Sequence, residues 1–204
     1  MEKLDLKKEL KHLYSTKTKP EIINVPELNY LGYKGRGEPG GIAYMESINA
    51  LYAISYTLKF KIKKENFVDY PVMPLEGLWW WDTPGIVNLD EAPPRETWNW
   101  ISLILTPKIV TTDMLEKVNT EVAQKKGDYV KKVELKVLNE GLCVQILHIG
   151  PYSEENRSQK ILSEYIKKEG YSLRGHHHEV YLNNPQRTAP NKIKTLLRHP
   201  VEKT

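Results

Sequence analysis

The sequence contains very little cysteine, because Cys143 is the only one among 204 residues. An internal disulfide framework is therefore excluded, and a reducing, cytoplasmic location is expected. The chain also has no run approaching eighteen apolar residues and no apolar segment near its N-terminus, so neither membrane spanning nor secretion is expected. Cys143 lies in the apolar run 142–149, which favours a small buried hydrophobe over a nucleophile.

Charge of one sign is not in large excess either. The sequence has 30 basic and 26 acidic residues, which leaves a net charge of +4. This balance is too even to indicate a nucleic-acid surface, and no helix-turn-helix, zinc-finger or RNA-binding signature is present. We therefore expect no direct DNA binding. The length and the 40% hydrophobic content are those of an ordinary globular protein with a sizeable core.

The first twenty residues are rich in lysine and carry leucines among the charges, at Leu4, Leu6, Leu10 and Leu13. This pattern predicts a short amphipathic helix packed on the body of the protein. Binding to a membrane surface or to phosphate is a minor alternative for such a basic segment. We expect residues 21–204 to form a single domain.

Two patterns resemble ligand sites without meeting their requirements. Neighbouring residues on a strand point to opposite faces, so only His176 and His178 of the three consecutive histidines could share a metal ion, and no third ligand is evident. The glycines at 35, 37, 40 and 41 match neither a dinucleotide-binding loop nor a P-loop, and a bend is the better interpretation. We expect no metal and no cofactor.

The predicted elements occur twice in the same order of strand, helix, strand and strand. The first pass, about 21–107, is predicted to contain a strand at 22–33, a helix at 42–60, and strands at 77–81 and 98–106 that flank a turn-rich segment with Pro84 and Gly85. The second pass, about 131–201, is predicted to contain paired runs at 132–138 and 142–149, a helix that begins at Ser153, and strands at 176–182 and 192–198. A helix at about 112–126 joins the two passes.

A repeat whose units are too small to bury their own apolar faces predicts that the two halves pack together. The expected fold is α+β with pseudo-twofold symmetry. An antiparallel sheet would carry helices on one side, and a ligand groove would lie between the halves.

Glu179 interrupts the predicted strand 176–182. Acids are depleted in strands and are rarely buried alone, so this carboxylate either faces water or serves a function. In the strand 98–106, Trp98 and Trp100 alternate with aliphatic residues and are predicted to face away from them. A groove lined by Trp80, Trp98 and Trp100 is one hypothesis, and ordinary core packing of these large side chains is the other.

Several motifs carry a resemblance to a known family. They span nearly the whole chain and are LDLKKELKHLYS near the N-terminus, YTLKF at 56–60, PLEGLWW at 74–80, GPY at 150–152, HEVYL at 178–182 and KTLLR at 194–198. In this order and spacing the chain resembles the GyrI-like (DNA gyrase inhibitor-like) small-molecule-binding family, in particular its stand-alone members.

The resemblance implies a pocket with Glu179 at its centre and Tyr152 at its edge. It also implies planar, hydrophobic and often cationic small-molecule ligands, which a carboxylate and aromatic rings attract by Coulomb force and by cation–π contact. The expected ligand-binding residues are Trp80, Trp98, Trp100, Tyr152, Glu179, Tyr181 and Tyr56. The first function considered is therefore sequestration of such xenobiotics.

Some stand-alone members that the chain resembles are cyclopropanoid hydrolases, which add water to strained-ring alkylating compounds. In this alternative Glu179 would deprotonate water, Tyr152 would donate a hydrogen bond to the oxygen that gains charge, and Glu76 could supply a second carboxylate. For Glu76 itself, a surface acid near a turn is the favoured interpretation. A further alternative is a macromolecular partner of unknown identity, bound through an exposed face as gyrase is by a gyrase inhibitor.

Overall fold

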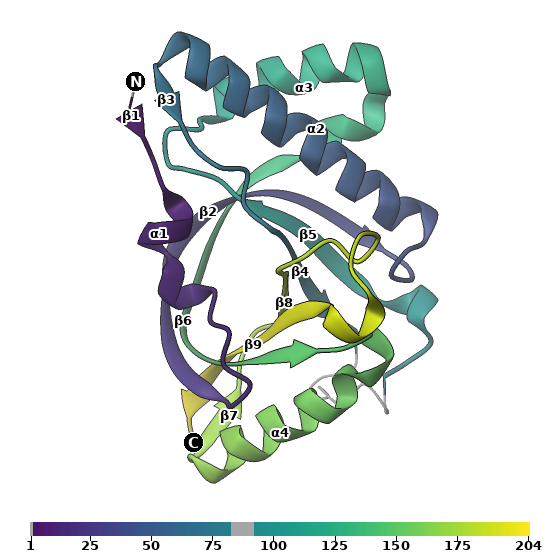
Figure 1. The fold of residues 1–204 in the computed structure, drawn as a ribbon. Coiled ribbons are helices and arrows are strands. Elements are labelled where there is room, and N and C mark those ends of the chain that lie inside the picture. The colour runs from purple at the N-terminus through teal and green to yellow at the C-terminus, as the bar shows by residue number, and fades with distance from the viewer. Residues whose placement is uncertain (1, 83–91) are drawn as a thin grey trace.

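The strands form an antiparallel sheet that closes on itself, as the computed structural model, which describes residues 2–82 and 92–204, shows (Figure 1). The strands that close the sheet are, in their spatial order, β6 (Glu134–Ile149), β2 (Glu21–Arg36), β5 (Asn99–Leu105), β4 (Leu75–Trp80), β8 (His177–Tyr181) and β9 (Lys194–Lys203). β9 pairs with β6 as well as with β8, which completes the ring. The short strand β7 (Tyr171–Leu173) pairs with the end of β9, and β1 (Glu2–Lys3) pairs with β3 (Val68–Asp69).

The longer helices lie outside the ring (Figure 1). α2 (Ile42–Glu65) packs on β2 and β5, and α3 (Thr112–Lys126) packs on α2. α4 (Glu155–Lys168) packs on β6 and β9 on another side of the ring. Leu162 and Ile166, one turn apart on α4, meet Ile146 and Leu197 in a separate apolar cluster. α3 begins where the Thr111 side chain accepts a hydrogen bond from the Met114 backbone N–H, and it ends at Gly127 with a φ of 105°.

The predicted α+β class and the duplication are confirmed, because β2, α2, β4 and β5 are followed by β6, α4, β8 and β9 in the same order. Closure of the sheet was not predicted. It arises because β6 is long enough to pair with β2 along one stretch and with β9 along another. An antiparallel ladder closed in this way leaves few exposed edges.

Two predicted elements differ from those in the structure. Residues 132–138 and 142–149 were predicted as two paired runs, yet β6 is one continuous strand. Its neighbour β2 supplies a partner on both sides of the predicted bend, from Gly32 opposite Glu134 to Glu21 opposite Gln145. β2 also continues beyond its predicted end to Arg36, so Gly35, which was predicted to lie in a bend, is part of the strand. Pro84 and Gly85 of the predicted turn-rich segment lie outside the described residues.

The N-terminal segment forms less helix than its composition predicts. α1 (Leu6–Glu9) is a single turn, followed by a 3₁₀ turn over Lys11–Leu13. Asp5 caps α1 by accepting a hydrogen bond from the Lys8 backbone N–H. Leu6 and Leu13 are buried against the body, so apolar contacts hold the segment in place despite its short helix.

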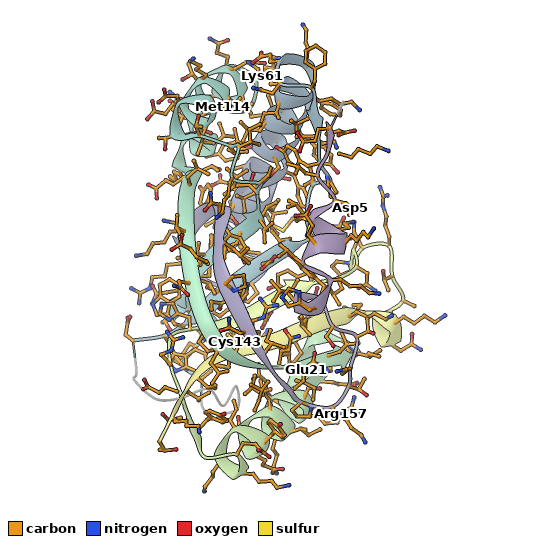
Figure 2. All side chains as sticks on the ribbon, turned by 90° about the vertical axis from the view of Figure 1, so that its left-hand side faces the viewer. Asp5, Glu21, Lys61, Met114, Cys143 and Arg157 are labelled. Carbon is orange, nitrogen blue, oxygen red and sulfur yellow. The ribbon has the colours of Figure 1, made fainter. Side chains whose placement is uncertain are left out.

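Cys143 is buried on β6, and burial raises the pKa of its thiol to about 12. A thiol that stays protonated is a poor nucleophile, which agrees with its interpretation as a small hydrophobe. Figure 2 shows Cys143 and Glu21 between the two ends of the molecule, with Lys61 and Met114 at one end and Arg157 at the other.

The inner face of the closed sheet contains a cluster of four buried charged side chains, which we call the inner cluster: Glu76, Glu140, His178 and Arg198. His178 Nε2 lies 2.9 Å from Glu76 Oε2, and His178 Nδ1 lies 2.9 Å from Glu140 Oε1. Arg198 Nη1 lies 3.6 Å from Glu140 Oε2. With His178 protonated, two cations balance two carboxylates, which is the condition for burying charge at a tolerable cost.

The N-terminal segment contributes directly to the inner cluster. The Tyr14 hydroxyl donates to Glu76 Oε1 at 3.1 Å, and Arg198 Nη2 donates to the Leu13 backbone carbonyl at 2.6 Å. Burial alone would lower the pKa of His178, but Glu140 and Glu76 outweigh that effect and raise it to about 9. Although burial opposes it, the positive charge of His178 lowers the pKa of Glu140 to about 2.

These pKa shifts predict that the protein loses stability in mildly alkaline solution. The pKa of His178 is higher in the folded protein than its ordinary value of about 6.5. Its stabilising charge is therefore fully present below about pH 6.5 and is lost as the pH rises through about 9. Urea unfolding across this interval should show a declining free energy of unfolding. A His178→Gln variant should not show this decline, and an unchanged decline in the variant would contradict the assignment.

Candidate active site

Glu179 lies in the middle of β8, which pairs with β4 on one side and β9 on the other. Because side chains alternate along a strand, His177, Glu179 and Tyr181 project outward on the side of the helices, whereas His178 joins the inner cluster. Glu179 is 9% exposed. The carboxylate is thus neither a solvent-facing acid nor a member of the inner cluster.

Polar groups contact the Glu179 carboxylate on both sides. The Tyr181 hydroxyl donates to Oε2 at 2.8 Å, and His177 Nε2 lies 3.1 Å from Oε1. His177 Nε2 also lies 2.8 Å from Gln159 Nε2 on α4, so this nitrogen either donates to Glu179 or, in the other tautomer, accepts from the Gln159 amide. The Trp79 indole N–H donates to the Tyr181 oxygen at 3.1 Å. A chain of polar contacts therefore orients the carboxylate before any ligand arrives.

Aromatic side chains surround this carboxylate on the side of α2. Tyr44, from the first turn of α2, lies with its hydroxyl 3.5 Å from that of Tyr181. Its ring packs against Trp79 with the centroids 5.3 Å apart and against Trp100 with the centroids 5.2 Å apart. Trp98 packs edge-on against Trp79. Burial raises the pKa of the Tyr44 and Tyr181 hydroxyls, which therefore stay protonated and remain hydrogen-bond donors.

A glycine provides the space for this arrangement. Gly77 on β4 is directly opposite Glu179 on β8. A Cβ atom at position 77 would lie 2.8 Å from the Trp79 indole nitrogen and 3.2 Å from the Tyr181 hydroxyl oxygen. The absence of a side chain thus allows Trp79 on β4 to reach Tyr181 on β8, the residue that donates to Glu179.

Glu155, at the start of α4, supplies a second carboxyl group close to Glu179. It is 4% exposed, and its Oε1 has no hydrogen-bond partner among residues 2–82 and 92–204. Burial, and next the negative charge of Glu179, raise its pKa well above the ordinary range. Glu155 therefore favours its protonated form more than an ordinary carboxyl group does, and it interacts electrostatically with Glu179, which suits acid and base roles. We call Glu155, His177, Glu179 and Tyr181 the acid site.

Tyr152 marks the solvent edge of the acid site. It lies in a 3₁₀ turn (Tyr152–Glu154) just before α4, is 40% exposed, and packs edge-on against Tyr181 with the ring centroids 6.1 Å apart. Burial, with the charges of Glu155 and Glu179, raises the pKa of its hydroxyl to about 12. The hydroxyl is therefore a donor throughout the physiological pH range.

The structure brings some of the predicted site residues together and separates others. Tyr152 and Tyr181 lie at Glu179, while Trp98 and the fully buried Trp100 lie behind Trp79 and Tyr44. Three predicted residues lie elsewhere, namely Glu76 in the inner cluster, Trp80 stacked on His176, and Tyr56 on the outer part of α2. Side chains alternate along β4, so those of Glu76 and Trp80 project from the face opposite to that of Gly77 and Trp79.

Sequence reasoning missed four contributors to the acid site and its surroundings, namely Glu155, His177, Tyr44 and Trp79. Glu155 follows the GPY motif by three residues, and Gln159 follows Glu155 by one helical turn. Helical spacing could therefore have indicated that both residues lie on the same face of the helix. Trp79 could not be distinguished from Trp80 without the register of β4.

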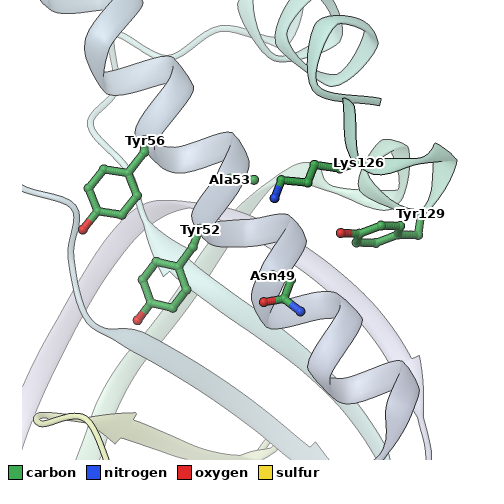
Figure 3. Close-up of a pocket in the computed structure, with 6 residues that line it drawn as sticks. All are labelled: Asn49, Tyr52, Ala53, Tyr56, Lys126 and Tyr129. Atoms are coloured by element: carbon green, nitrogen blue, oxygen red, sulfur yellow. The ribbon is translucent and has the colours of Figure 1, made fainter. Parts of the chain in front are cut away.

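A surface hollow of about 420 Å³ lies apart from the acid site, lined by Asn49, Tyr52, Ala53, Tyr56, Lys126 and Tyr129 (Figure 3). None of the acid-site residues lines it. In the described parts of the chain, no group of three or more histidine, cysteine, aspartate or glutamate side chains could hold a metal ion. Within the same residues, no helix combines the length and apolar character needed to cross a membrane.

Comparison with known proteins relates this architecture to a family. An uncharacterized conserved protein from Listeria innocua is 38% identical, with a TM-score of 0.88 over 98% of this chain and 100% of that one. A hydrolase from the same organism is 37% identical, with a TM-score of 0.84 over the same shares. Residues 105–202 match the GyrI-like small molecule binding domain. The chain belongs to the GyrI-like family.

More distantly related structures share only the fold with this chain. The C-terminal domain of EcmrR is 12% identical, with a TM-score of 0.56 over 91% of this GyrI-like chain and 98% of that domain. A comparison with curated proteins gave no significant match. The GyrI-like assignment makes the protein a small-molecule binder, and the acid site is its candidate centre of chemistry.

Proposed function

We propose that the protein is a hydrolase that adds water to the strained ring of planar aromatic compounds of the cyclopropanoid class. The observation that supports this most is the buried Glu179 carboxylate, which accepts a hydrogen bond from Tyr181 and has Tyr152 packed on that tyrosine at the solvent edge. The buried Glu155, whose pKa is raised by burial and by the charge of Glu179, supplies a second carboxyl group. The relative named as a hydrolase, which aligns over the whole of its length, supports hydrolysis more than sequestration.

The reaction would use the two carboxyl groups in complementary roles. Glu179 takes a proton from water, and the water oxygen forms a bond to a cyclopropane carbon. The strained carbon–carbon bond breaks, and its electron pair moves through the conjugated ring to a carbonyl oxygen. That oxygen takes the proton of Glu155, and solvent later returns the proton from Glu179 to Glu155. The product differs from the substrate by one added water.

The surrounding side chains would lower the barrier by positioning and by electrostatics. The Tyr152 hydroxyl would donate a hydrogen bond to the oxygen that gains charge, as the donors of an oxyanion hole do. Tyr181 and His177 would keep the Glu179 carboxylate aimed at the water, so that little reorganisation is needed during the reaction. The rings at the acid site, Tyr152 and Tyr181 among them, would stack on a flat substrate.

Mass spectrometry of a cyclopropane-bearing alkylating compound after incubation with the protein tests this function. The expected product carries the added mass of one water and forms in proportion to enzyme and time. A sample without protein measures spontaneous ring opening. Recovery of the compound at the rate of that blank, despite binding, would reject the hydrolase assignment.

The role of Glu155 gives a pH prediction. Because the neutral acid is required, the rate should fall as the pH rises through the raised pKa of Glu155. Glu155→Gln should lower kcat by about 100-fold or more and remove that alkaline limb. The pH profile of kcat is the measurement, and the exposed neighbour Glu154→Gln serves as the matched control. Parental kcat in Glu155→Gln would exclude this residue as the acid.

A second candidate function is sequestration of planar aromatic cations without turnover. It is favoured by the position of the Glu179 carboxylate among the rings of Tyr181, Tyr152 and Trp79. Each cation–π contact contributes on the order of 1 kcal/mol. A cationic dye should then quench tryptophan fluorescence, emerge chemically unchanged, and bind Glu179→Gln more weakly.

A further inference from the structure

His177 has two neighbours that compete for the same ring nitrogen. Its Nε2 lies 3.1 Å from Glu179 Oε1 and 2.8 Å from the Gln159 amide nitrogen. A carboxylate oxygen only accepts a hydrogen bond and an amide nitrogen only donates one, so Nε2 cannot bond both in a single state. With its proton on Nε2 a neutral imidazole donates to Glu179, and with its proton on Nδ1 it accepts from Gln159 instead.

The second nitrogen of His177 therefore decides how Glu179 is held. His177 Nδ1 is buried, and no group in residues 2–82 and 92–204 forms a hydrogen bond with it. The partner of one imidazole nitrogen fixes the tautomer and thereby the bond that the other nitrogen can form. The surroundings of Nδ1 thus control the contact between His177 and the carboxylate.

His199 on β9 is a polar side chain that packs against His177. The two ring centroids are 5.5 Å apart, and the ring planes are tilted by 33°. His199 is 2% exposed, and neither of its ring nitrogens has a hydrogen-bond partner within the described parts of the chain. Burial, and next the interaction with His177, lower its pKa to about 3. The ring is therefore neutral and presents one N–H donor and one acceptor.

These buried polar atoms are suited to an internal water molecule. His177 Nδ1, both ring nitrogens of His199 and the Gln159 amide oxygen lack hydrogen bonds within the described chain, and a buried polar group without one destabilises a protein. Internal water satisfies such groups, typically with about three hydrogen bonds, because it both donates and accepts. Two hydrogen bonds of about 2.8 Å through one water span the separation of the two rings.

We propose that His199 is a positioning residue for Glu179, which acts through one bridging water and His177. The His199 N–H donates to the water, and the water donates to His177 Nδ1. The proton of the neutral His177 is thereby kept on Nε2, where it donates to Glu179 Oε1. The Gln159 amide turns its oxygen toward this N–H. The inference rests on the proposed function, because it concerns the base of that reaction.

This arrangement gives the Glu179 carboxylate a donor for each oxygen. Tyr181 donates to Oε2 and His177 donates to Oε1, so the carboxylate is fixed before a substrate binds. A base held in this way needs little reorganisation during proton transfer. In the other tautomer, the lone pair of His177 Nε2 faces Oε1 and repels it. His199 is buried too deeply to touch a substrate, so its removal should change kcat more than KM.

Nitrogen NMR of isotope-labelled histidine side chains tests the tautomer, because the protonated and unprotonated nitrogens of a neutral imidazole give well-separated signals. His177→Gln identifies the signals of His177 by their loss. We expect the parent to carry the proton of neutral His177 on Nε2. In His199→Phe, which keeps a buried aromatic ring without an N–H, we expect signals of the form protonated on Nδ1 to appear.

The addition of water to a strained-ring substrate is measured with the same variants. His199→Phe should lower kcat by about 10- to 100-fold with little change in KM, the loss found when a partner that orients a functional side chain is removed. His199→Asn and His199→Gln carry an amide N–H near the two ring-nitrogen positions, and the one that meets the water should recover most of the rate. Ser55→Ala removes another buried hydroxyl without a partner in the described chain and, as the control, should change neither measurement.

The outcomes separate this inference from the proposed function. A parent in which neutral His177 carries its proton on Nδ1 would overturn the positioning role. A folded His199→Phe variant with the parental tautomer and the parental kcat would do the same. If His199→Phe does not fold, the tautomer of the parent and the rates of His199→Asn and His199→Gln decide instead. A parent that adds no water rejects hydrolysis alone, since the tautomer of His177 with and without His199 still decides the contact through water.

Discussion

Replacing Glu179 with Gln is expected to lower the rate of water addition by about 100- to 10,000-fold, the range typical of a lost general base. Gln keeps the size of the side chain, and its carbonyl oxygen can still accept the hydrogen bond from Tyr181. The fold and the binding of uncharged ligands should therefore change little. The loss isolates the proton-accepting role from the structural one.

The measurement is the initial rate of product formation by mass spectrometry, together with the thermal unfolding temperature of each variant. Glu164→Gln, at an exposed position on α4, is the matched control and should behave as the parent. Water addition at the parental rate in a folded Glu179→Gln variant would remove this residue from the mechanism. Glu155 would then be the carboxyl group to test as the base, because Glu76 faces the inner cluster.

Replacing Arg198 with Met is expected to lower the free energy of unfolding by about 3–5 kcal/mol. Arg198 is 1% exposed and lies between Glu140, Gln145 and the Leu13 carbonyl. Its removal leaves the carboxylates of the inner cluster with one cation instead of two. An uncompensated buried charge destabilises a protein far more than a lost surface pair does.

Urea unfolding gives this value, and Lys61→Met is the control because it breaks an exposed pair with Glu121. The control should change stability little. Adding Glu140→Gln to Arg198→Met should restore part of the loss, since it removes the charge that was left unpaired. Equal stability of Arg198→Met and the parent would mean that the inner cluster does not hold the sheet closed.

Local chemistry explains which predictions from the sequence succeeded. The helix at 112–126 was predicted with its observed bounds, because Thr111 and Gly127 provide start and stop signals that depend on nearby residues only. Glu179 was singled out because an acid inside a strand is costly wherever that strand lies, and its role in chemistry stays a prediction. The family motifs around it pointed to the same residue.

Partners distant in sequence explain what was missed. The sequence offered Trp79 and Trp80 as equal candidates, and only pairing of β4 with β8 places Trp79 on the face of Glu179. From the sequence, Glu76 was interpreted as a surface acid near a turn. In the structure it is buried and contacts His178 and Tyr14, which come from other parts of the chain. A one-residue change in the register of β4 would exchange its two faces, and the places of Trp79 and Glu76 would change with them.

The sequence by itself determined the α+β order of elements, the duplication, and Glu179 as an acid that a strand would not otherwise contain, since each follows from periodicity and local preference. Only the tertiary structure decided that the sheet closes, that Glu155 is buried and interacts with Glu179, and that Glu76 belongs to a buried ionic cluster. Those facts depend on which distant strands pair and in which register, and pairing of that kind is set by packing of the whole chain rather than by any local segment.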